Sequence, residues 1–144
     1  MNLTAHFTLE ELSFSSTAYR LGIDNTVPNG LLPNMQVLAT GLEKVRIFLG
    51  FPMYIDSGYR CLALNTMVHG SKNSAHISCF AGDFICPAFG TPLMIVQALA
   101  ASGIKFDQLI QEGTWVHISF APAMRQQVLT ATFVDGNASY KLGL

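Results

Sequence analysis

Residues 74–83 read SAHISCFAGD, and residues 115–119 read WVHIS. Together the two stretches supply two imidazoles, His76 and His117, and one carboxylate, Asp83. Two nitrogen ligands and one oxygen ligand suit Zn²⁺, and a set of three protein ligands leaves the fourth coordination position open, as in catalytic zinc sites. A water molecule on such an ion loses a proton near neutral pH and can attack a carbonyl group. The two stretches therefore predict a metal site of the hydrolytic kind.

Apolar periodicity predicts helices mainly in the first part of the chain. Thr8 and Glu11 have the spacing of a capping box, so a short helix is expected to follow Thr8. Between residues 34 and 49 the apolar positions recur at steps of three and four, which indicates an amphipathic helix ended by Gly50. Further helices are expected over residues 16–21, 62–68 and 92–101, the last with Thr91 as its N-cap.

Strand signals dominate the later part of the chain. Strands are expected over residues 53–56, 82–85, 107–112, 115–120, 128–134 and 138–142, and Asp135-Gly136 is a strong signal for a type I′ turn. In the strand over 115–120, the period of two places His117 on the opposite face from Val116 and Ile118. We therefore predict an α+β fold in which N-terminal helices pack on a small antiparallel sheet that carries the metal site.

The length and composition of the chain limit the number of domains and the class of protein it can be. The 144 residues fit one domain, 1–144, and a chain that is 50% hydrophobic and 12% charged is expected to be globular. With a net charge of −1, the chain lacks the excess of positive charge that binds the phosphates of nucleic acid. The N-terminus lacks a signal-peptide pattern, and the apolar stretch 93–101 is too short for membrane insertion. Three cysteines, an odd number without a secretory signal, are expected to be reduced thiols.

Other motifs occur in a fixed order along the chain. They are FTLEEL at 7–12, GIDN at 22–25, SGYR at 57–60, FDQLI at 106–110 and closing strands around Phe133. With the two stretches quoted first, this set resembles the zinc D-alanyl-D-alanine carboxypeptidases and endopeptidases of peptidoglycan. It resembles most closely the endolysin-like enzymes of bacteriophages, which consist of a single catalytic domain. The resemblance covers nearly the whole chain.

The resemblance implies a role for several residues. His76, Asp83 and His117 would be the Zn²⁺ ligands, and Glu112 would be the general base. Arg60 would stabilise an oxyanion or hold the substrate, which suits a side chain that is always charged.

Three further residues are expected at the site. Asp107 is a second candidate for the base, or holds a ligand histidine by its other nitrogen. Ser74 and Trp115 are expected to line the site and contact the substrate, although an ordinary loop serine and a core tryptophan are equally good interpretations. All three are therefore counted as substrate-binding candidates.

The cysteines leave alternatives open. Members of the family usually have glycine where this chain has Cys79, so a side chain here is expected to narrow the loop or to require a negative φ. Cys79 or Cys86 is an alternative zinc ligand, since thiolates bind zinc well. In an oxidising compartment, Cys61 and Cys79 are candidates for a disulfide.

The implied substrate is a peptidoglycan stem peptide, cleaved after D-alanine. The D-alanyl–diaminopimelate cross-link is the leading bond, and removal of a terminal D-alanine is the alternative. Such an enzyme is expected to be a monomer, made in a host cytoplasm and acting at the bacterial cell wall or periplasm. A zinc-binding module without catalysis, as in the Hedgehog signalling domain, is a rival. A D,D-dipeptidase is disfavoured by Thr114, where those enzymes have glutamate.

Overall fold

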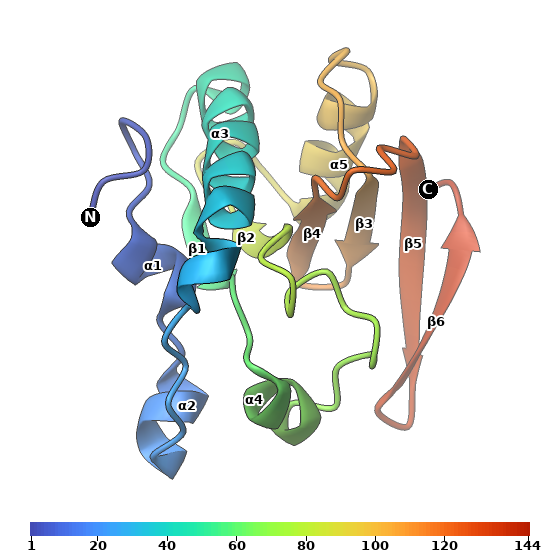
Figure 1. Ribbon diagram of the computed structural model, residues 1–144. Helices are drawn as coiled ribbons and strands as arrows, with labels where there is room; N and C mark the ends of the chain where they lie inside the picture. Colours follow the sequence, from blue (N-terminus) through green and yellow to red (C-terminus); the bar gives the residue numbers. More distant parts are fainter.

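The computed structural model describes residues 1–144 and shows an α+β fold built around one six-stranded sheet (Figure 1). The sheet has the strand order β1-β2-β4-β3-β5-β6. Its strands are β1 (Tyr54–Ser57), β2 (Ala81–Ile85), β3 (Gln108–Glu112), β4 (Trp115–Ser119), β5 (Gln127–Val134) and β6 (Asn137–Leu142). The helices are α1 (Leu9–Ser13), α2 (Ser16–Leu21), α3 (Leu32–Leu49), α4 (Leu62–Met67) and α5 (Pro92–Ala100), with a 3-10 turn over Asn29–Leu31.

The predicted fold class is confirmed, with two differences in arrangement. The sheet is antiparallel except that β3 pairs with β5 in parallel. The reason is that β4 returns antiparallel to β3, and residues 120–126 then reverse the chain and carry it to the other edge of β3. In addition, α4 and α5 are inserted between strands, so the helices are not confined to the N-terminal part of the chain.

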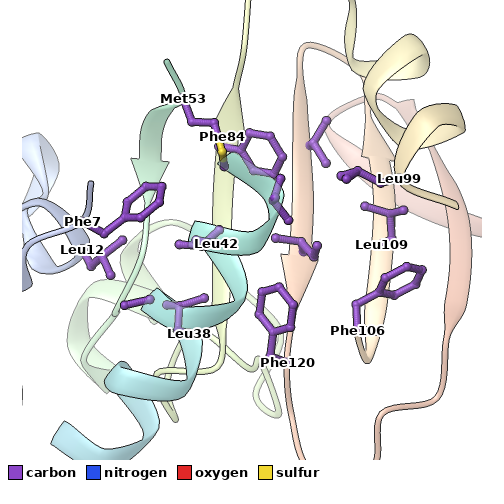
Figure 2. Close-up of a cluster of buried hydrophobic side chains, with 14 of the residues drawn as sticks. Phe7, Leu12, Leu38, Leu42, Met53, Phe84, Leu99, Phe106, Leu109 and Phe120 are labelled. Atoms are coloured by element: carbon purple, nitrogen blue, oxygen red, sulfur yellow. The ribbon is translucent and has the colours of Figure 1, made fainter. Parts of the chain in front are cut away.

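One face of the sheet packs on α3 and α5 to form the main hydrophobic core (Figure 2). The predicted apolar stripe of α3 is buried, and Leu38 and Leu42 have no exposed surface. Gly41 allows α3 to approach Phe120, because a Cβ atom at this position would lie 2.5 Å from the phenyl ring. Truncating a fully buried leucine to alanine typically costs about 2–5 kcal/mol. The core therefore fixes the sheet on which the polar face is built.

The opposite face of the sheet carries polar side chains on β2 and β4 and, toward β5, a small apolar cluster of Ile110, Leu129 and Ala131. Val116 and Ile118 of β4 point into the core, so the period of two turns His117 to the other face, as predicted. At the far edge, β5 and β6 are joined by Asp135 and Gly136, whose φ values of 50° and 79° fit the predicted type I′ turn. None of the helices combines the length and the hydropathy that a membrane span requires.

Candidate metal centre

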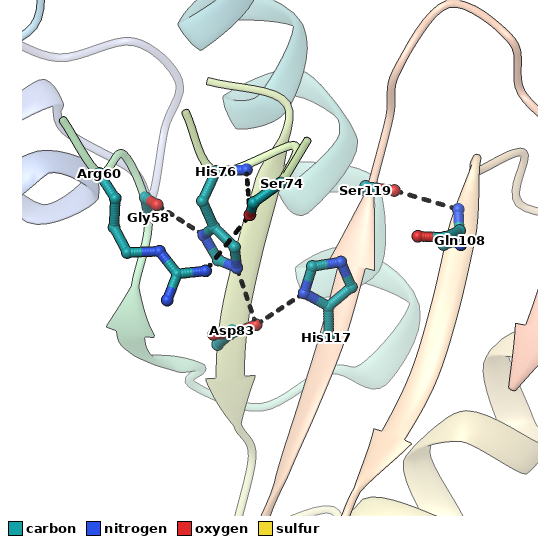
Figure 3. Close-up of polar contacts among 8 residues, drawn as sticks. All are labelled: Gly58, Arg60, Ser74, His76, Asp83, Gln108, His117 and Ser119. Carbon is teal, nitrogen blue, oxygen red and sulfur yellow. Dashed lines mark hydrogen bonds and ion pairs between the residues drawn. The ribbon is translucent and has the colours of Figure 1, made fainter. Parts of the chain in front are cut away.

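His76, Asp83 and His117 converge on the polar face of the sheet (Figure 3). Asp83 of β2 is directly opposite His117 of β4 in the strand register, and His76 comes from the loop that leads into β2. The Oδ1 atom of Asp83 lies 2.9 Å from Nδ1 of His117 and 3.2 Å from Nε2 of His76. One ligand atom from each residue lies within 4.8 Å of the others, so a single ion can contact all three.

The backbone fixes the orientation of the His76 ring. Its Nδ1 atom lies 2.7 Å from the carbonyl oxygen of Gly58, and because a carbonyl only accepts, this nitrogen carries the hydrogen and donates. The other ring nitrogen, Nε2, is then left with its lone pair directed at the cluster. Burial holds the pKa of His76 below its ordinary value, although Asp83 opposes the shift. A neutral imidazole is the form that binds a metal.

Asp83 is held in its ionised form. Burial by itself would raise the pKa of Asp83, but the neighbouring His76 and His117 outweigh this effect and lower the pKa. A carboxylate between two imidazole nitrogens gives the two-nitrogen, one-oxygen donor set of zinc hydrolases. The residues present therefore fit Zn²⁺.

The loop with the sequence SGYR is anchored from three sides. The amide of Tyr59 donates to the carbonyl of Leu12 at 2.8 Å, and the amide of Arg60 donates to the carbonyl of His76 at 3.1 Å. The Asn25 side chain donates to the carbonyl of Tyr59 at 3.0 Å and accepts from the amide of Cys61 at 2.8 Å, so it holds the backbone on both sides of Arg60. This explains why the GIDN and SGYR motifs occur together.

Arg60 extends along the cluster toward Ser74. Its Nη2 atom donates to the Ser74 hydroxyl at 3.4 Å, and the same hydroxyl accepts from the amide of His76 at 3.2 Å. Burial lowers the pKa of Arg60, with Asp83 and Glu112 opposing the shift, and a guanidinium remains charged at neutral pH. Its buried Nε atom has no hydrogen-bond partner in the protein.

Glu112 and Trp115 lie opposite each other at the end of the β3–β4 hairpin. Both are on the face that carries His117, because Trp115 is two residues from it along β4. Burial raises the pKa of Glu112, while His117 and Arg60 partly lower it. The Trp115 ring lies 6.2 Å from the Phe133 ring, measured between centroids. These positions put a carboxylate and an aromatic surface beside the candidate metal ligands.

Asp107 is bound by Arg125, a residue that no sequence motif indicated. Arg125 donates to Oδ1 of Asp107 from Nε at 2.9 Å and to Oδ2 from Nη2 at 2.8 Å. These hydrogen bonds lower the pKa of Asp107. Asp107 makes no hydrogen bond to His76 or His117. Arg125 lies in a loop outside every motif, so nothing in the sequence pointed to this pair.

The cysteines do not join the ligand group. Cys79 has a φ of 63°, so the expectation of a negative φ is wrong, and the loop makes a left-handed turn as it would with glycine. Burial raises the pKa of Cys79 to about 12. Neither Cys79 nor Cys86 belongs to the group of side chains whose ligand atoms converge, which is His76, Asp83 and His117. Cys86 lies in the hydrophobic core. All three cysteines are free thiols, and Cys61 serves as the N-cap of α4.

A single cleft of about 890 Å³ contains the whole candidate site. It is lined by all eight residues expected from the sequence, namely Arg60, Ser74, His76, Asp83, Asp107, Glu112, Trp115 and His117. Its wall also includes Arg125 and, from the β5–β6 hairpin, Phe133 and Tyr140. Arg125 and Tyr140 lie in no motif, and Phe133 was noted only as part of the closing strands, so none of the three was expected at the site; strand pairing and loop packing bring them to the cleft.

Comparison with known proteins agrees with this geometry. No curated protein sequence matches the chain. The family model described as Peptidase M15 matches residues 5–119, which include all eight of the expected site residues. The chain therefore belongs to the M15 peptidases, the family of the zinc D-Ala-D-Ala carboxypeptidases.

Proposed function

We propose that this protein is a zinc-dependent peptidase that hydrolyses the bond after D-alanine in the stem peptides of peptidoglycan. The observation that carries the proposal is the convergence of three metal-ligand side chains with Arg60 and Glu112 in one cleft. The resemblance to peptidoglycan peptidases and the membership in the M15 family support the choice of substrate. The resemblance also favours an endolysin-like enzyme, made in a host cytoplasm and acting at the cell wall, and we propose that it is a monomer.

His76, Asp83 and His117 would hold the metal. When held there, Zn²⁺ would supply Lewis-acid polarisation of the scissile carbonyl group and would lower the pKa of a water molecule toward neutral pH. The remaining chemistry belongs to protein side chains, because amide hydrolysis also needs a proton acceptor, a proton donor and stabilisation of the developing negative charge.

Glu112 is the proposed proton carrier. As a carboxylate it takes a proton from the attacking water, and as a carboxylic acid it gives that proton to the leaving amine, so the two transfers balance. The pKa of Glu112, raised by burial, brings the acid form closer to working pH than for an exposed glutamate. This is the environment that a residue needs when it must act as both base and acid.

Arg60 is the proposed electrostatic partner of the substrate. Its guanidinium lies beside the ligand cluster and has an unpaired, buried Nε donor. Such a group stabilises the negative oxygen that develops as the carbonyl is attacked. Ser74 supports this geometry by accepting a hydrogen bond from the guanidinium.

The size of the cleft favours cleavage of a cross-link. A volume of about 890 Å³ is near the upper end of the roughly 300–1,000 Å³ range of small-ligand sites. Both substrates place a stem peptide on one side of the scissile bond, but only the D-alanyl–diaminopimelate cross-link adds a second peptide on the other side, and a cleft of this size has room for it. We therefore propose endopeptidase activity, and carboxypeptidase activity is the second candidate because the family includes such enzymes.

The test is digestion of purified muropeptide dimers by the zinc-loaded protein, with products identified by mass spectrometry. Release of monomers would support the endopeptidase, and release of free D-alanine would identify the carboxypeptidase. A chelator should stop either reaction. If zinc is bound and neither product forms, the assignment as a peptidoglycan peptidase is wrong.

A further inference from the structure

The β5–β6 hairpin lies outside the family match, which ends at residue 119. Nevertheless Leu129, Phe133, Ala138 and Tyr140 of this hairpin line the cleft that contains the ligand cluster. In Figure 1 the hairpin stands at the sheet edge, and the loop that follows α4 extends toward it. The cleft therefore has one wall from the matched region and a second wall from outside it.

Strand register places Tyr140 on the same face as the metal ligands. Ile110 of β3 pairs with His117 on one side and with Leu129 of β5 on the other. Ala131, two residues after Leu129, pairs with Tyr140 of β6. Paired residues share a face, and so do residues two apart in a strand. The metal-ligand face thus continues without interruption from β4 to Tyr140.

The surface between His117 and Tyr140 is apolar. Ile110, Leu129 and Ala131 form a small buried cluster that is separate from the main core. Phe133 continues this surface to the Trp115 ring. An aromatic and aliphatic floor of this kind suits the uncharged parts of a peptide, and it excludes water from hydrogen bonds made above it.

Tyr140 has a hydroxyl group that is free to bind a ligand. The residue is 52% exposed, and its side chain makes no hydrogen bond within the protein. Burial, Glu112 and Asp83 raise the pKa of Tyr140 while Arg60 lowers it, so the phenol stays protonated and remains a donor. The influence of these three charged groups also agrees with a ring that lies beside them in the cleft.

We propose that Tyr140 is a substrate-binding residue whose hydroxyl donates a hydrogen bond to a main-chain carbonyl of the stem peptide, while Trp115 and Phe133 contact its aliphatic parts. This inference rests on the proposed function for the identity of the ligand. It assigns to the β5–β6 hairpin the part of the substrate that extends away from Arg60 and Ser74.

The test measures binding rather than cleavage. The probe is the muropeptide monomer with a tetrapeptide stem, which is a product of the proposed reaction and is not cut further by it. The zinc-loaded protein is titrated by calorimetry and by the fluorescence of Trp115, which is the single tryptophan and lies in the cleft. Tyr140→Phe removes only the hydroxyl, and Tyr54→Phe, on the exposed side of β1 outside the cleft, is the matched control.

We expect Tyr140→Phe to raise the Kd about threefold to tenfold, the usual range for one hydrogen bond. Tyr140→Ala should raise it further, and Tyr54→Phe should leave it unchanged. Equal Kd values for the parent and both Tyr140 variants would overturn the inference and leave the peptidase proposal intact. Conversely, a parent that binds the monomer in a Tyr140-dependent way but cleaves no dimer would support this surface and contradict the proposed reaction.

Discussion

Glu112 illustrates how the surroundings of one side chain set its chemistry. It is on the same sheet face as His117, and burial raises its pKa. We expect Glu112→Gln to lower kcat by a factor of about 10² to 10⁴, the range for general acid–base catalysis, because glutamine cannot carry the proton. The measurement is the rate of muropeptide dimer cleavage together with the zinc content, which should stay at one ion per chain.

A glutamate outside the cleft provides the control. Glu43→Gln changes the same chemical group on α3, where Glu43 pairs with His6 at 3.0 Å. This variant should cleave dimers at the parent rate. If Glu112→Gln were as active as Glu43→Gln, the proton carrier would have to be another residue, or the protein would be a zinc-binding module whose activity has a different origin.

Asp107 supports a prediction about stability and pH. Its folded pKa lies below the ordinary value of 3.8, mainly because of the hydrogen bonds from Arg125. Because the unfolded chain binds this proton more readily, the contribution of Asp107 is fully present above about pH 4 and is lost as pH falls through the folded pKa. Urea unfolding of the parent should therefore show a loss of stability on acidification that is smaller in Asp107→Asn. An identical slope of unfolding free energy against pH below pH 4 would contradict this role.

At the scale of elements, the short loop between β1 and α4 connects the core to the ligand cluster. Gly58 holds the His76 ring through its carbonyl, and a Cβ atom on Gly58 would lie 2.1 Å from the backbone oxygen of Leu12. Neither backbone can give way easily. We expect Gly58→Ala to destabilise the fold by about 1–3 kcal/mol, as for other overpacked sites, and to weaken zinc binding by moving the carbonyl that orients His76.

Thermal unfolding and zinc titration measure both effects of Gly58→Ala. Gly30→Ala is the matched control, because a Cβ atom at Gly30 meets nothing within 4 Å and its backbone has no positive φ. It should keep the stability and zinc affinity of the parent. If Gly58→Ala had the same stability and zinc affinity as Gly30→Ala, the loop would tolerate the shift of its backbone that a Cβ atom at residue 58 requires.

Most elements could be predicted from the sequence because their signals are local. The helix expected over 34–49 begins at Leu32, since Pro33 fits the first helical turn, where no backbone donor is needed. The parallel pairing of β3 with β5 could not be predicted, because residues 120–126 contain no turn signal that fixes the direction of the next strand. The left-handed turn at Cys79 was not predicted from the residue itself, because a cysteine disfavours a positive φ, although the glycine usual at this position in the family is the residue that such a turn favours.

The residues of the candidate site also fall into those that the sequence predicts and those that it does not. The candidate ligands and Arg60 lie in short motifs, so their residue types and order are recognisable in the sequence itself. Arg125 and Tyr140 have no motif, and they reach the cleft through a loop packing on Asp107 and through the register of two paired strands. Contacts of this kind depend on tertiary structure, which a single sequence does not specify residue by residue.

At the scale of the whole molecule, the two faces of the sheet have different roles. Its apolar face packs on α3 and α5, and its polar face carries the ligand cluster and the cleft. Alternate residues of one strand therefore face the core and the candidate site, as Val116 and His117 do in β4. An ion bound by the proposed ligands would stabilise the entire fold, because these residues come from β2, β4 and the loop between α4 and β2.

Zinc removal tests this coupling. With one site and no binding to the unfolded chain, stabilisation grows as RT ln(1 + [Zn]/Kd), about 1.4 kcal/mol for each tenfold rise in zinc above the Kd. The Tm should therefore be lowest in chelator and rise steadily with added zinc. His117→Ala should abolish this dependence, whereas His6→Ala, which changes a histidine paired with Glu43 far from the cluster, should preserve it. A Tm that is the same in chelator and in zinc, or a zinc response that survives His117→Ala, would show that His76, Asp83 and His117 do not form the metal site.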